Sequence, residues 1–252
     1  MKKQTVRILF SITFIGFILV TLAGQSFASL ANAGASLDWS QLSIFGSLNW
    51  ISRTTSTNAT VSNSFGETGT VSDQKPGWVS SSSPATISNA GAQGISAAPQ
   101  SLSASSYSSL ADIGLSNSSG GAVLTGSFTA TALGWVIVTI PYFVSLDLTS
   151  SSDPTGGALG RSRVMVSLSR TDGSSTDFVE LFLTVNNGRT FNQSRSGMFG
   201  LMKEFDVGET GIFTAEVFTE TATSNPVPLP GAAWLFAPGL ACFFGLRRKF
   251  SN

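Results

Sequence analysis

The sequence predicts an all-β protein, with one antiparallel β-sandwich or jelly-roll-like domain between an N-terminal signal peptide and a C-terminal transmembrane helix. Three observations support this fold class. Charged residues are only 11% of the 252 residues and hydrophobic residues are 42%, a balance that suits an extracellular β-protein better than a helical bundle. Apolar and polar residues alternate with period two in several runs. Both ends of the chain carry an uncharged apolar stretch with basic neighbours.

The first 33 residues have the form of a secretory signal peptide. Three basic residues precede an uncharged apolar run over 8–23, which is short for a membrane span. Small residues then allow cleavage after Ala28 or after Ala33. An uncleaved N-terminal anchor is the alternative. We therefore expect the folded domain to occupy residues 34–224, outside the cytoplasm.

The second half of this domain carries the clearest strand signals. Pro141 interrupts the longest alternating run, so we expect an edge position or a bulge there. Asp-Gly and Asn-Gly pairs at 172–173 and 187–188 supply residues that accept the positive φ of tight turns. The expected strands lie within 124–131, 136–148, 164–168, 179–185 and 213–217.

The first half of the domain is predicted to be rich in loops. Residues 36–51 contain enough apolar positions for one or two strands. From 52 to 119, Ser, Thr, Gly and Asn dominate and apolar anchors are few. Long loops with weak strands and a partly disordered polar coil both fit such a composition.

Composition excludes several classes of function. The chain has no histidine, so Ser-His-Asp and Cys-His catalysis and histidine-ligated metals are excluded. Its single cysteine, Cys242, precludes an intrachain disulfide. The body between the two ends keeps eight basic residues against all fourteen acidic ones, a net charge of about −6 that disfavours nucleic-acid binding. We expect no catalytic residues, no metal site and no cofactor.

Aromatic and acidic residues supply the remaining candidate sites. Trp39, Trp50 and Trp78 are candidates for an aromatic surface that contacts sugar rings, and core packing is the alternative. Two acidic groups are close in sequence, as a carboxylate pair of a glycoside hydrolase would require, but they fall near predicted turns, where solvated charge is the ordinary explanation. The two groups are Asp172, Asp177 and Glu180, and Glu204, Asp206 and Glu209.

The C-terminal segment 225–252 has three successive parts. A proline cluster stiffens the chain. An 18-residue uncharged run over 229–246 follows. As a helix it would be about 27 Å long, enough for the hydrocarbon core of a bilayer. The basic cluster Arg247, Arg248 and Lys249 would then keep the end of the chain in the cytoplasm.

This arrangement resembles the PEP-CTERM sorting domain. The motif is Val227-Pro228-Leu229-Pro230, with Leu where the family usually has Glu between the prolines. The resemblance covers the last 28 residues and implies a substrate of an exosortase in a Gram-negative bacterium. It implies an export route through transient anchoring in the inner membrane to the cell surface or extracellular matrix, and a structural or adhesive role among exopolysaccharides in biofilms.

Two alternatives to this interpretation of the tail and body remain, and a third is disfavoured. The apolar run would also suit a plain membrane anchor, and the body would suit a carbohydrate-binding module exported by the same route. A Gram-positive sortase signal would need a Thr after Leu229-Pro230, and this chain continues with Gly and Ala instead.

Overall fold

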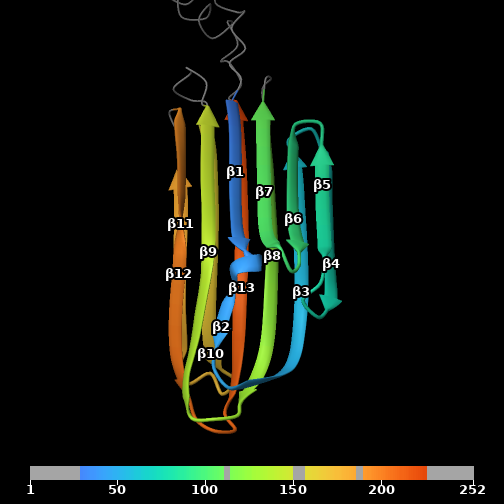
Figure 1. Ribbon diagram of the computed structural model, residues 1–252. Coiled ribbons are helices and arrows are strands. Elements are labelled where there is room, and N and C mark those ends of the chain that lie inside the picture. The colour runs from blue at the N-terminus through green and yellow to red at the C-terminus, as the bar shows by residue number, and fades with distance from the viewer. Residues whose placement is uncertain (1–28, 111–113, 150–156, 186–189, 226–252) are drawn as a thin grey trace, which may run out of the picture. The chain divides into compact units, whose positions relative to one another are not determined.

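The computed structural model describes residues 29–110, 114–149, 157–185 and 190–225. Most of these residues belong to antiparallel strands of two sheets (Figure 1). The described part of the chain holds no helix with the length and hydrophobicity needed to cross a membrane. The predicted signal peptide up to Ala28, the motif 227–230, the predicted helix 229–246 and the basic cluster 247–249 all lie outside the described residues.

The first sheet, here sheet A, has the spatial order β12-β9-β1-β7-β6-β5, and the short strand β2 also pairs with β9. Its strands are β1 (Ser29–Asp38), β2 (Ser43–Phe45), β5 (Ser81–Ile87), β6 (Ala90–Ala97), β7 (Ser101–Leu110), β9 (Gly134–Thr149) and β12 (Phe191–Phe205). A single turn of 3₁₀ helix, Trp39–Gln41, follows β1, and the Asp38 carboxylate accepts a hydrogen bond from the backbone N–H of Ser40.

The second sheet, here sheet B, has the order β11-β10-β13-β8-β3-β4. Its strands are β3 (Leu48–Asn63), β4 (Thr68–Pro76), β8 (Gly114–Ala130), β10 (Gly157–Arg170), β11 (Thr176–Val185) and β13 (Thr210–Asn225).

Alternating side chains bring the two sheets together as a sandwich. Along β13 every second side chain is buried, as expected for a strand with one face toward a core. The main core cluster takes residues from both sheets, and its largest fully buried members are Phe128, Phe205 and Phe213. The prediction of an all-β protein with antiparallel sheets is thus confirmed.

The prediction of a loop-rich first half is wrong. Strands β3 to β7 and the beginning of β8 occupy most of 52–119. Their buried faces consist mainly of Ala, Gly, Ser and Thr, and their exposed faces carry the same kinds of residue. Buried and exposed positions therefore alternate along these strands, but the residues at the two kinds of position hardly differ in hydropathy.

Pro141 lies neither in an edge strand nor at a bulge. Strand β9 is internal, and its pairing with β12 runs without a register shift through Pro141. On the other side, β1 pairs with β9 only from Tyr142 onward, and β2 pairs only up to Thr139. Pro141 thus falls in the gap between β2 and β1, where β9 has no partner on that side. No backbone N–H is needed there, so a proline is tolerated without an edge position or a bulge.

The spacing between the sheets differs across the sandwich. In the half formed by β9 to β13 and the last part of β8, Leu, Val, Ile and Phe fill the core. In the half formed by β3, β5, β6 and the facing parts of β7 and β8, the backbones approach directly. A Cβ built on Gly94 of β6 would lie 1.9 Å from the carbonyl oxygen of Gly121 in β8. These are called below the large-residue half and the small-residue half.

The first and last described residues meet at one end of the domain (Figure 1). Strand β1 starts at Ser29 and β13 ends at Asn225. The Ser29 hydroxyl donates a hydrogen bond of 3.0 Å to the side-chain oxygen of Asn225. The segments before residue 29 and after residue 225 are therefore attached to neighbouring points of the same domain.

Candidate functional site

The three predicted tryptophans do come together, but inside the domain. The ring of Trp78 lies 5.2 Å from that of Trp39 and 4.9 Å from that of Trp50, edge to face in both cases. Trp39 is buried, and the other two pack against the main core cluster. The indole N–H of Trp78 donates to the backbone carbonyl of Thr125.

Arg53 closes this cluster from outside. Its guanidinium carbon lies 5.0 Å from the ring centre of Trp50 and 4.7 Å from that of Trp78, a cation–π arrangement. A sugar-binding platform needs a ring with one open face. The edge-to-face packing and the Arg53 side chain make these tryptophans part of the structural core instead.

Two of the predicted acidic residues, Asp172 and Asp177, have structural partners. The carboxylate of Asp177 forms an ion pair of 2.9 Å with the buried Lys203. This ion pair joins β11, an edge strand of sheet B, to β12, an edge strand of sheet A. The carboxylate of Asp172 accepts a hydrogen bond from the backbone N–H of Ser174 in a turn, which lowers the pKa of Asp172. Across the described ranges, no group of three or more His, Cys, Asp or Glu could hold a metal ion.

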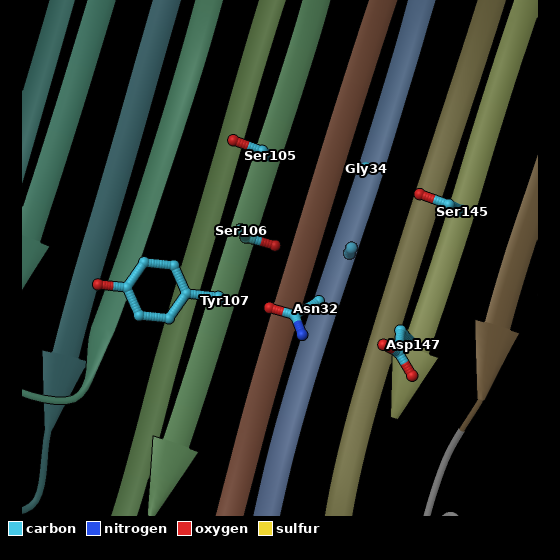
Figure 2. A pocket seen from close by; sticks show the side chains of 8 residues that line it. Asn32, Gly34, Ser105, Ser106, Tyr107, Ser145 and Asp147 are labelled. Atoms are coloured by element: carbon cyan, nitrogen blue, oxygen red, sulfur yellow. The ribbon is translucent and has the colours of Figure 1, made fainter. Parts of the chain in front are cut away.

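A hollow of about 260 Å³ lies on the outer face of sheet A, over its central strands β7, β1 and β9 (Figure 2). Gly34 contributes no side chain there, and a Cβ at that position would lie 2.8 Å from the Ser145 hydroxyl oxygen. The volume is below the roughly 300–1,000 Å³ of pockets that enclose small molecules. The hollow therefore suits contact with part of a larger molecule.

Tyr107 forms one side of this hollow. Its ring lies flat on the sheet, seen face-on in Figure 2. The ring covers Gly91, its cross-strand partner in β6, because a Cβ on Gly91 would lie 2.3 Å from a ring carbon of Tyr107. Tyr107 is 41% exposed, so one face of the ring rests on the backbone and the other faces solvent.

Polar side chains continue the hollow beside the ring. Asn32 of β1 is the cross-strand partner of both Tyr107 and Asp147, and Figure 2 shows it between them. Ser105, Gly34 and Ser145 form the neighbouring row in the same three strands. This surface combines an exposed aromatic face with neutral hydrogen-bonding groups and a single carboxylate.

Little in the sequence predicts this site. Tyr107 stands in a Ser-rich stretch of the half predicted to be rich in loops, and Asn32 lies within the predicted signal peptide. The only usable signal was that Tyr107 is one of just two tyrosines and occurs in an otherwise polar run. Its position beside Asn32 and Asp147 depends on strand pairings between distant segments.

Comparison with known proteins identifies no family. No protein-family model matches the chain, and no curated protein matches its sequence. Inferences about its function therefore rest on its own residues and on the resemblance of its C-terminal segment.

Proposed function

We propose that the chain is an exported protein that an exosortase sorts to the cell surface or extracellular matrix, where its domain has a structural or adhesive role and no enzymatic one. The observation that carries this proposal is the order of Val227-Pro228-Leu229-Pro230, the uncharged run 229–246 and the basic residues 247–249. We further propose a jelly-roll-like class for the sandwich, which crosses repeatedly between its two sheets.

The position of the domain's two ends supports this route. Because β13 ends at Asn225, the proline motif follows the last strand almost at once. A processing enzyme that recognises this motif would therefore act close to the end of β13 in the sequence. The two ends lie together, so one end of the domain would face the membrane during sorting and the rest would remain free.

Strand β1 favours signal cleavage after Ala28 over cleavage after Ala33. Removal of residues 29–33 would delete half of β1, which pairs with β7 and β9 in the middle of sheet A. Ser29 and Ala31 are fully buried, so the loss would also open the core. We therefore propose Ser29 as the first residue of the mature protein.

The test is to follow the C-terminal segment in the native host with and without its exosortase gene. We expect the wild-type strain to accumulate protein that lacks the basic cluster 247–249, and the deletion strain to retain the full tail in the inner membrane. Replacement of Pro228 and Pro230 by Ala should reproduce the effect of the deletion. If both strains retain the same full-length tail, the proposal is contradicted and the segment is a plain membrane anchor.

A further inference from the structure

We propose that the outer face of sheet A binds a neutral polysaccharide, with the ring of Tyr107 as the stacking surface and Asn32 and Asp147 as hydrogen-bonding groups. The binding surface, here called the trough, runs across the strands through the hollow shown in Figure 2. It does not involve the tryptophan cluster.

The Tyr107 ring has the geometry that a sugar ring requires. The flat faces of pyranose rings carry C–H groups that pack on an aromatic face. A tyrosine offers such an apolar face together with a polar hydroxyl group at its tip. Tyr107 is held flat because Gly91 lies beneath it. Little conformational entropy would be lost when a ligand covers the outer face.

The polar groups repeat across the sheet with a suitable period. Cross-strand pairing continues each row of the hollow into β6 and β12. One row contains Gly91, Tyr107, Asn32, Asp147 and Asn192, and the other contains Gln93, Ser105, Gly34, Ser145 and Ser194. Neighbouring strands are about 4.8 Å apart, close to the length of one sugar unit in an extended chain. Successive sugars would therefore meet successive strands.

The free hydrogen-bonding capacity lies beside the ring. Within the described ranges, the side chains of Asn32, Tyr107 and Asp147 have no hydrogen-bond or ion-pair partner. Sugar hydroxyls both donate and accept hydrogen bonds, so they match an amide, a phenol and a carboxylate together. Asn32 lies between Tyr107 and Asp147, so its side-chain amide could bond to sugar hydroxyls on either side of it.

Charge selects a neutral polymer. The residues that line the hollow include one carboxylate and no basic side chain, and the body of the chain is acidic overall. An anionic polysaccharide or a nucleic acid would meet repulsion there without compensating Lys or Arg. A neutral chain avoids this cost.

This site deepens the proposed function, since it names the matrix component that an exported protein would contact. It can nevertheless be tested on purified full-length chain in a nonionic detergent, without any processing step. Failure of sorting would appear in the C-terminal segment of the host protein, whereas failure of binding would appear only in the experiment below.

The experiment is affinity electrophoresis in native gels that contain hydroxyethyl cellulose, galactomannan or dextran, with alginate as the anionic comparison. We expect at least one neutral polymer to retard the wild-type chain and alginate to have no effect. Tyr107→Ala should weaken binding at least about tenfold, and Asn32→Ala should weaken it by a smaller factor. Tyr107→Phe keeps the ring and should retain most of the binding.

Phe178→Ala is the matched control, because Phe178 is an exposed aromatic residue of sheet B, 63% exposed and outside the trough. It should bind as the wild type does. Thermal unfolding shows whether Tyr107→Ala still folds. If Tyr107→Ala does not fold, the binding of Asn32→Ala and Asp147→Ala is compared with that of the wild type instead. The proposal is overturned if no neutral polymer retards the wild type, if alginate retards it most, or if the folded variants bind unchanged.

Discussion

The two halves of the sandwich solve the same packing problem with different side chains. In the large-residue half, Phe128, Phe205 and Phe213 fill the space between sheets. In the small-residue half, the sheets come so close that a hydroxyl of one reaches the other. Thr57 of sheet B shares hydrogen bonds with the hydroxyls of Ser81 and Ser83 of sheet A, at 2.9 and 2.8 Å.

Close spacing gives several buried hydroxyls of the small-residue half a partner in the facing sheet, although those of Ser106 and Ser108 in β7 have none among the described residues. A buried hydroxyl without a partner costs about 1–3 kcal/mol. The Ser118 hydroxyl of sheet B avoids this cost by donating to the backbone carbonyl of Tyr107 in sheet A, at 2.8 Å. The two sheets can lie this close only because their facing residues are small. In turn, the short Ser and Thr side chains reach partners in the other sheet only because the sheets are close.

The largest expected effect is that of Gly94→Ala in the small-residue half. The added Cβ would lie 1.9 Å from the carbonyl oxygen of Gly121, and backbone cannot move aside as a flexible side chain can. We expect a loss of about 3 kcal/mol or more, seen as unfolded or insoluble protein. Gly200→Ala in β12 is the control, because nothing lies within 4 Å of its Cβ position. A stable Gly94→Ala variant would show that the sheets are not in close contact there.

The next effect is a cavity in the large-residue half. Phe128 is fully buried, and its ring lies 5.2 Å from that of Phe205 and 5.5 Å from that of Trp50. We expect Phe128→Ala to lower the free energy of unfolding by about 3–5 kcal/mol, measured by urea denaturation. A loss below 1 kcal/mol would contradict a tightly packed aromatic core in this half.

Buried hydroxyls should differ according to their partners. Thr57→Val removes a hydroxyl that bridges the sheets, so we expect a loss of about 1–2 kcal/mol. Thr219 in β13 is also buried, but its hydroxyl has no hydrogen-bond partner among the described residues. Thr219→Val should therefore be neutral or stabilising by up to about 1 kcal/mol. Equal effects of the two substitutions in thermal unfolding would contradict a stabilising role for the Thr57 bridge between the sheets.

The smallest effect concerns acid stability at the edge of the small-residue half. Hydrogen bonds from Lys75 and then Ser81 lower the pKa of Asp73 below its ordinary value of 3.8. A lowered pKa in the folded state contributes stability that is present above the ordinary value and is lost as pH falls through the lower one. Asp73 is on the surface, so the effect should be slight. Asp73→Asn should flatten the dependence of the melting temperature on pH below about 4; an unchanged slope would contradict this role.

The two halves also explain what could be predicted from sequence. Alternation predicted strands in the large-residue half because Val164 or Phe213 contrasts strongly with neighbouring Ser or Thr. The small-residue half has no such contrast, since the buried Thr57 and Ala59 alternate with polar residues. The trough was missed for a further reason. Tyr107, Asn32 and Asp147 come from three distant segments, and only strand pairing brings them together.

Mass determination of the mature protein from its native host tests the central claim most directly. The proposal predicts a chain that begins at Ser29 and ends near Pro230, with or without a covalently attached acceptor at its new terminus. Such a mass would agree with the intact β1 strand and with removal of the apolar and basic segments. A mature chain that still ends at Asn252 would contradict exosortase processing.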